Sequence, residues 1–219
     1  MSLPEANPNQ ALFLLGVNAC LQGEWEEAFR RFVTVIGQAP AWPEPYHNLG
    51  VVYWHQGDTE SAQKSWEKAL SLRPRFVEAL IGLGLANLTA GRQHEGLRCM
   101  ERAVAISSRA ESFNALGVAL FCGAQVEDAS RCFEKAVSVD STLSAPLRNL
   151  ATLFRARGQD AEAQHCLSRA ALARDLSGFS MASLYVSVPI ARRIGEMTEE
   201  EYDAPEAIFT VYDLDEPED

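Results

Sequence analysis

Residues 46–57 have the sequence YHNLGVVYWHQG, in which apolar side chains recur at helical spacing and a glycine, Gly50, interrupts the apolar run. Glycine inside a helix costs about 1 kcal/mol relative to alanine. A helix that keeps glycine there needs a packing reason, such as a neighbouring segment that comes too close for a side chain. We expect that neighbour to be another helix of the same chain.

The leucine–glycine pair recurs along the chain at intervals of 34, 34, 33 and 34 residues, with alanine replacing the last glycine. A repeat of this length indicates an array of similar structural units. The pairs are Leu15-Gly16, Leu49-Gly50, Leu83-Gly84, Leu116-Gly117 and Leu150-Ala151. Each is followed by a small, a large apolar and another apolar residue: Ala28, Phe32 and Val35; Ala62, Trp66 and Ala69; Gly96, Met100 and Ala103; Ala129, Phe133 and Ala136; Ala163, Leu167 and Ala170.

This pattern resembles the tetratricopeptide repeat (TPR) family, whose period is about 34 residues. The best match is 43–76, through Tyr46, Leu49, Gly50, Tyr53, Gly57, Ala62, Trp66, Ala69 and Pro74. The resemblance implies an all-α, right-handed solenoid in which each unit is a helix–turn–helix pair. It covers residues 9–177, in units 9–42, 43–76, 77–109, 110–143 and 144–177.

Within a unit, the resemblance gives particular residues structural roles. We expect the backbones of the two helices to approach each other at Gly50 and Ala62. Gly57 should end the first helix, because glycine is common just past a helix C-terminus. Asp58 or Thr59 should cap the second helix.

The resemblance also implies a concave surface lined by the first helix of every unit. Its apolar character in the first four units favours a protein-interaction site, and arginines near its end can grip a carboxylate. We therefore expect a partner peptide or helix with apolar anchors and an acidic end. The expected groove residues are Phe13, Val17, Cys20, His47, Asn48, Val51, Trp54, His55, Ile81, Leu85, Leu88, Asn114, Val118, Phe121, Arg148, Asn149, Thr152 and Arg155.

Two alternatives concern this surface. Val17, Val51, Leu85 and Val118 belong equally well to the core, because columns one helical turn apart are easily confused. The Lys/Asn/Arg clamp of TPR co-chaperones that hold acidic chaperone C-termini is not matched, since only Asn48 fits it.

The net charge of −11 is concentrated at the C-terminus. Residues 196–219 contain eleven of the thirty acidic residues and no Lys or Arg, so the preceding part has nineteen acidic and nineteen basic residues. An acidic chain of this kind is unsuited to nucleic acid. Such a tail is usually solvated, but its apolar residues suggest a short motif that orders on binding. These residues are Ile208, Phe209, Val211, Tyr212 and Leu214.

We therefore hypothesise that residues 205–215 dock on the repeat surface of their own chain or of a neighbour. Between array and tail, residues 178–195 are expected to form a capping helical segment, because Met181, Leu184, Tyr185 and Val188 keep helical spacing. The alternative of membrane binding is weak here, since only Arg192 and Arg193 are basic.

No pattern for catalysis, metal or cofactor emerges. The glycines belong to the repeat, and His47 and His55 have no third ligand placed with them. Five cysteines without close pairs make a poor disulfide framework and favour a reducing, cytoplasmic location. The apolar stretch ending at Cys20 lacks the basic residues of a signal peptide, and no run is long enough to span a membrane.

These observations leave three hypotheses. The first is a non-catalytic adaptor that binds a protein partner in its groove. The second is a self-assembling scaffold, or an autoinhibited module, in which the tail docks on the repeat surface. The third, an enzyme or its regulatory subunit, has no residue pattern in its favour.

Overall fold

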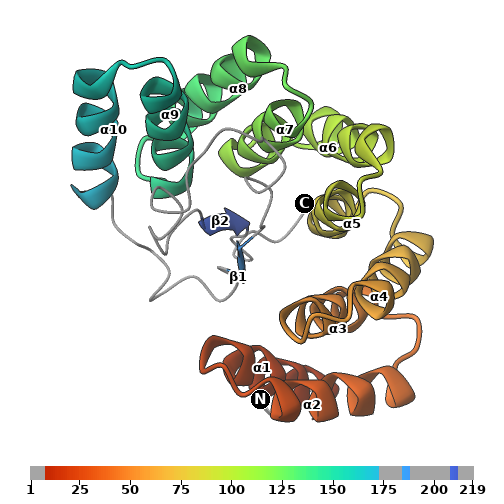
Figure 1. Cartoon of the computed structure of the whole chain (residues 1–219). Helices are drawn as coiled ribbons and strands as arrows, with labels where there is room; N and C mark the ends of the chain where they lie inside the picture. Colours follow the sequence, from red (N-terminus) through yellow and green to blue (C-terminus); the bar gives the residue numbers. More distant parts are fainter. Residues whose placement is uncertain (1–7, 173–183, 188–207, 212–219) are drawn as a thin grey trace, which may run out of the picture.

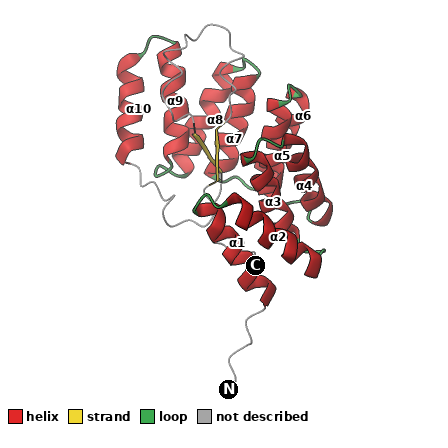
Figure 2. Ribbon diagram, turned by 60° about the horizontal axis from the view of Figure 1, so that its bottom comes forward, coloured by secondary structure: helices red, strands yellow, loops and turns green. Residues whose placement is uncertain are grey.

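The computed structural model describes residues 8–172, 184–187 and 208–211. In this part of the chain, ten helices follow one another as antiparallel pairs along a curved arc, seen from two sides in Figures 1 and 2. The TPR-like solenoid expected from the sequence is therefore present. The helices are α1 Pro8–Leu21, α2 Trp25–Gln38, α3 Pro43–His55, α4 Thr59–Leu72, α5 Val77–Thr89, α6 Gln93–Ile106, α7 Ala110–Cys122, α8 Val126–Val139, α9 Ser144–Ala156 and α10 Asp160–Leu172.

The two helices of each pair are joined by the same tight turn, which needs one residue with positive φ. Glycine adopts this backbone conformation without a steric penalty, whereas a Cβ atom disfavours it. The fourth unit has alanine here, so its turn is strained relative to the others. The turn residues are Gly23, Gly57, Gly91, Ala124 and Gly158, with φ of 74°, 80°, 76°, 57° and 70°.

Helix ends in the second unit match their expected signals. The Gly57 amide donates to the carbonyl of Trp54 at 3.0 Å, which closes the last turn of α3. The Asp58 side chain then accepts a hydrogen bond from the Ser61 amide at 3.0 Å and caps α4. An N-cap of this kind contributes about 1 kcal/mol to helix stability. Of the two expected caps, Asp58 is therefore the one used.

The ring of Trp66 on α4 fills the space between two glycines of successive first helices. A Cβ atom added at Gly50 on α3 would lie 2.6 Å from Nε1 of Trp66. One added at Gly82 on α5 would lie 2.5 Å from its Cε2. Both distances are far inside van der Waals contact, so neither position has room for a side chain. Trp66 thus joins its own unit to the next one.

Other repeat glycines face the large side chain of their own second helix in the same way. Cβ atoms at Gly16, Gly84 and Gly117 would lie 2.7, 2.8 and 2.5 Å from Phe32, Met100 and Phe133. At Gly50, too, the ring of Trp66 is what an added side chain would meet first. Backbones do come close in the third unit, where a Cβ on Gly96 would lie 3.0 Å from the Gly84 carbonyl oxygen.

The core runs between the two helix layers as two clusters of buried side chains. The smaller cluster contains Phe32 and joins the first unit to α3. The larger contains Trp66, Met100 and Phe133 and continues to the fifth unit. The large side chains of the second helices therefore form the central line of the core in both clusters.

Two short strands, β1 Leu184–Ser187 and β2 Ile208–Val211, pair antiparallel. At 184–187, within the expected capping helical segment 178–195, the structure has strand β1 in place of a helix. A four-residue apolar stretch fits helical or strand spacing equally well. Tyr, Phe, Val and Ile favour strands once a partner strand is available. The rest of the expected cap, 178–183 and 188–195, lies outside the described residues.

The packing of Trp66 generates a prediction about coupling. Gly82→Ala should reduce the free energy of unfolding by about 1–3 kcal/mol, because the new methyl group overpacks the indole. The loss should be smaller in a Trp66→Phe background. The fourth unit has Phe133 at the position of Trp66, and the residue of the next unit that corresponds to Gly82 is the larger Asn149. Chemical denaturation of the four proteins measures this coupling.

Gly37→Ala provides the control, because no atom lies within 4 Å of the Cβ that it adds on α2. This change should leave stability unaltered or raise it by less than about 1 kcal/mol, through helix propensity alone. Equal losses for Gly37→Ala and Gly82→Ala would contradict the packing argument.

Candidate functional site

The first helices of the units, α1, α3, α5, α7 and α9, line the inner side of the arc (Figure 1). Successive members α1 and α3, α3 and α5, and α5 and α7 contact one another directly. Direct contact between α7 and α9 is less extensive than between α5 and α7. The concave surface is thus closed along its first four helices and more open at α7 and α9.

Most of the expected groove residues in the first four units are buried. Val17, Val51, Leu85 and Val118 pack in the same clusters as Phe32 and Trp66, so these four residues belong to the core. The accessible part of the surface comes from fewer residues. The buried ones are Phe13, Val17, His47, Asn48, Val51, Ile81, Leu85, Leu88, Asn114 and Val118; Cys20, Trp54, Phe121, Arg148 and Asn149 are half-buried; His55, Thr152 and Arg155 are exposed.

Ring contacts hold two of the aromatic groove residues against the array. The Trp54 ring packs at 6.0 Å from that of Trp66, and His55 stacks on Trp25 at 4.1 Å and 11°. Partial burial by this stack lowers the pKa of His55. Trp25 was missed by the sequence analysis, because it lies at the start of α2 and outside the repeat columns.

His47 is buried on α3 with its ring 5.2 Å from that of Phe76. Burial lowers the pKa of His47 to about 3, so its imidazole is neutral at physiological pH. The two histidines of α3 therefore have different surroundings, one in the core and one in a surface stack. Among the described residues, no group of three His, Cys, Asp or Glu could hold a metal ion.

The five cysteines are free and lack an activating environment. Burial raises the pKa of Cys20 and Cys122 to about 12 and also raises those of Cys99, Cys132 and Cys166. A thiol with a raised pKa is protonated at neutral pH and a poor nucleophile. The cysteines consequently act as packing residues.

The open end of the concave surface is polar. Asn149 on α9 donates from Nδ2 to Oδ1 of Asn114 on α7 at 2.8 Å, which joins the two helices. Arg148 and Arg155 lie seven residues apart on α9, so they share one helix face. The sequence of α9, SAPLRNLATLFRA, contains no acidic residue. This end of the array therefore offers positive charge beside the half-buried ring of Phe121.

β2 lies against α7 and α9. Figure 1 shows it inside the curve of the arc, with β1 beside it. The backbone of 208–211, part of the expected tail motif, is thus located at the same end of the groove as Arg148 and Arg155. Tyr212 and Leu214 of that motif lie outside the described residues.

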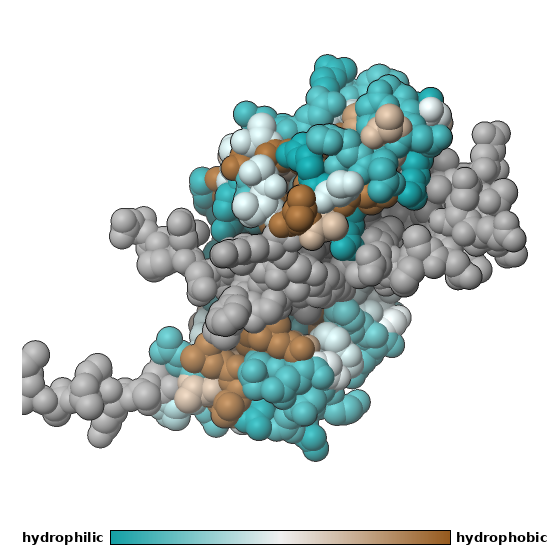
Figure 3. Space-filling view, turned by 90° about the vertical axis from the view of Figure 1, so that its left-hand side faces the viewer, coloured by the Kyte–Doolittle hydropathy of each residue, from teal (hydrophilic) through white to brown (hydrophobic). Residues whose placement is uncertain are grey.

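Exposed large hydrophobic side chains gather on the N-terminal pair. Leu15 is 50% exposed, although its counterparts Leu49 and Leu150 are 8% and 5% exposed because a preceding unit covers them. Leu14 and Leu21 on α1 and Val33 on α2 are exposed as well. Figure 3 shows this as a brown area on the lower part of the molecule, where the N-terminal pair lies.

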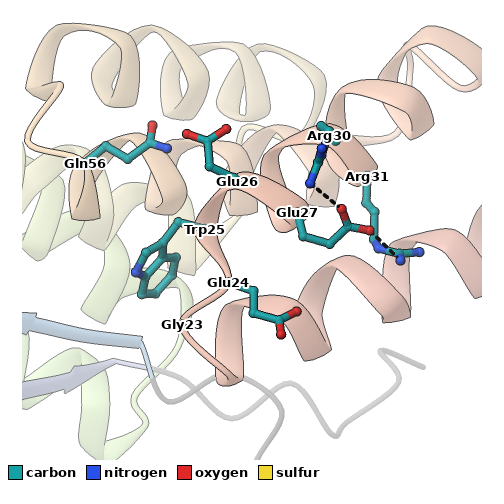
Figure 4. A pocket seen from close by; sticks show the side chains of 8 residues that line it. All are labelled: Gly23, Glu24, Trp25, Glu26, Glu27, Arg30, Arg31 and Gln56. Atoms are coloured by element: carbon teal, nitrogen blue, oxygen red, sulfur yellow. Dashed lines mark ion pairs between the residues drawn. The ribbon is translucent and has the colours of Figure 1, made fainter.

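A shallow depression of about 780 Å³ lies at the start of α2, between Trp25 and Gln56 (Figure 4). Its charged side chains largely satisfy one another, since Glu27 forms ion pairs with Arg30 at 2.9 Å and Arg31 at 2.5 Å. Nε of Arg31 is nevertheless buried there without a hydrogen-bond partner. None of the expected groove residues lines this depression, so we place the candidate site at the α7–α9 end of the concave surface.

Comparisons with known proteins agree with the helical array. The model of the tetratricopeptide repeat matches residues 43–76. A thermophilic TPR protein of Thermus thermophilus, TTC0263, is similar in structure (TM-score 0.70, 19% identity, 77% of this chain and 93% of that one). So are PilF of Pseudomonas aeruginosa (0.66, 19%, 75% and 76%) and MamA of Desulfovibrio magneticus RS-1 (0.60, 21%, 78% and 98%). No curated protein matches the sequence significantly.

The described helices are all too short or too polar to cross a membrane. At the identities found, the solved structures establish the fold of the array and nothing further.

The burial of His47 generates a prediction about pH. Its pKa is about 3 in the folded chain and about 6.5 in the unfolded chain. The unfolded state therefore binds the proton first, and stability is lost as pH falls below about 6.5. Between pH 7 and pH 5, the His47→Gln variant should lose about 2 kcal/mol less unfolding free energy than the wild type.

Denaturant unfolding at the two pH values measures this difference. His165→Gln, at an exposed position of α10, serves as the matched control and should follow the wild type. Parallel pH dependence in all three proteins would show that His47 accepts a proton in the folded chain.

Proposed function

We propose that the chain is a non-catalytic interaction module, because the tetratricopeptide repeat model matches residues 43–76 and the helical array has the fold of TPR proteins. It binds a segment of a partner protein on its concave surface, within a larger complex. The five free cysteines suit a reducing compartment such as the cytoplasm.

The arrangement at the α7–α9 end carries this proposal. Phe121 and Arg155 occupy equivalent positions on neighbouring first helices, four residues after Gly117 and Ala151. An apolar side chain and an exposed guanidinium therefore lie on adjacent helices of one wall. Guanidinium groups bind carboxylates through two parallel hydrogen bonds. This pairing favours a partner segment with an apolar anchor followed by acidic residues.

Replacing both arginines tests this binding mode. Arg148→Ala with Arg155→Ala should weaken partner binding by roughly 100-fold, because two charge-assisted hydrogen bonds contribute about 3 kcal/mol together. Affinity capture from an extract of the producing cells, followed by titration of the enriched protein, measures the loss.

The control is a charge-matched double variant in the outer helices. Arg98 on α6 and Arg131 on α8 are both exposed, and their replacement by alanine removes the same charge from the other side of the array. This variant should retain the partner. If both double variants lose or keep it equally, binding does not involve α9.

A second candidate function, a self-assembling scaffold, is favoured by the exposed leucines of α1. This helix, PNQALFLLGVNACL, contains no charged residue. Two copies could pack their α1 faces together without burying a charge, which is the usual obstacle to such an interface. A symmetric dimer brings the same patch of both copies into contact.

The oligomeric state decides between the two candidates. If the scaffold is correct, sedimentation should show a concentration-dependent dimer that Leu15→Lys converts to a monomer. Leu172→Lys removes a leucine that is 86% exposed at the opposite end of the array and should leave the dimer intact. A wild-type chain that stays monomeric at all concentrations rules out the scaffold and leaves the adaptor.

A further inference from the structure

The tail segment at the groove is an extended strand and not a helix. β2 pairs with β1 in an antiparallel register that sets Leu184 opposite Val211, Tyr185 opposite Thr210, Val186 opposite Phe209 and Ser187 opposite Ile208. All four residues of β2, IFTV, and two of the four residues of β1, LYVS, are β-branched or aromatic, and such residues favour this conformation. β1 therefore supplies backbone hydrogen-bonding partners at the groove for an extended segment.

The location of β2 coincides with the most open part of the concave wall. The contact between α7 and α9 is less extensive than that between α5 and α7, and β2 lies against both α7 and α9. In the preceding units, the first helices bury their inward side chains against one another. An added segment therefore finds accessible wall at this end, beside Phe121, Asn149 and Arg155.

Charge complementarity supports the same location. The eleven acidic residues of 196–219 flank β2 on both sides, with Glu206 before it and Asp213 after it. Of the two helices it lies against, α9 contains Arg148 and Arg155 and no acidic residue, and α7 contains one acidic residue, Glu111, in its first turn. Opposite charges near a surface attract one another most strongly at low ionic strength.

From these observations we propose that β2 is the chain's own copy of the ligand that the groove binds. The partner segment, on this view, is an extended peptide of the same chemistry, apolar and β-branched with acidic flanks. It takes the place of β2 on β1 and against α7 and α9, a form of strand addition. This inference rests on the proposed function and narrows it, because a helical partner could not pair with β1.

The proposal implies that the groove is regulated by its own tail. A two-stranded ribbon alone is only marginally stable, so release of β2 is energetically accessible. Residues 188–207 nevertheless tether β2 to β1, which gives it an effective concentration in the millimolar range. A free partner must compete with that concentration, so the intact chain binds weakly until β2 is displaced.

The test uses a fluorescent peptide with the sequence of residues 203–215 and the full-length chain. Thr210→Pro in the chain removes a backbone donor from β2 and should weaken its pairing with β1. The labelled peptide should then bind the variant at least about tenfold more tightly than the wild type. Fluorescence anisotropy measures both affinities.

Two controls make the result specific. The same peptide carrying Thr210→Pro has matched charge and hydrophobicity but should not bind either chain. Arg155→Ala, added to the Thr210→Pro chain, should weaken binding of the unmodified peptide about tenfold. Arg131→Ala, on the outer helix α8, should leave it unchanged.

Equal binding of the peptide to both chains, or to neither, would overturn the proposal of a resident strand. Binding of the proline peptide as tightly as the original would also overturn it, since the recognised form would not be a strand. Partner capture that depends on Arg155, together with failure of the peptide, would leave the adaptor function standing without self-docking.

Discussion

The array depends on a large side chain of each second helix entering space that glycine leaves on a first helix. Trp66 shows this most fully, because its ring lies between Gly50 on α3 and Gly82 on α5. Burying a large apolar side chain contributes about 1.5–3 kcal/mol, more than the helix propensity that one glycine loses. The contact links three helices of two units, which is why such units are stable only when stacked.

The same packing determines which part of the concave surface is accessible. Where first helices contact one another, as α3, α5 and α7 do, their inward columns become core, and Val51, Leu85 and Val118 are buried. In the last unit the equivalent of Val118 is Thr152, which is exposed. The proposed binding mode therefore uses the end of the array, where polar and charged residues replace apolar ones.

The repeat could be predicted from sequence because each signal has a local cause. The glycine interval, the turn residues and the Asp58 cap each depend on backbone geometry within one unit. Exposure of the groove could not be predicted, since it depends on how closely neighbouring units approach. For β1, a four-residue apolar stretch carries too little periodicity to separate helix from strand, and its strand character depends on a partner more than twenty residues away.

The charge distribution explains why the tail would select one end of the array. The chain before residue 196 has equal numbers of acidic and basic residues, so it exerts no net long-range attraction on an acidic segment. Beyond about 8–10 Å, salt screens the remaining fields. Attraction must then come from a local excess of positive charge, and the sequence of α9 contains Arg148 and Arg155 and no acidic residue. In the proposed docking mode, an acidic segment with an apolar, strand-forming centre meets complementary charge, the Phe121 ring and a pairing strand at that end.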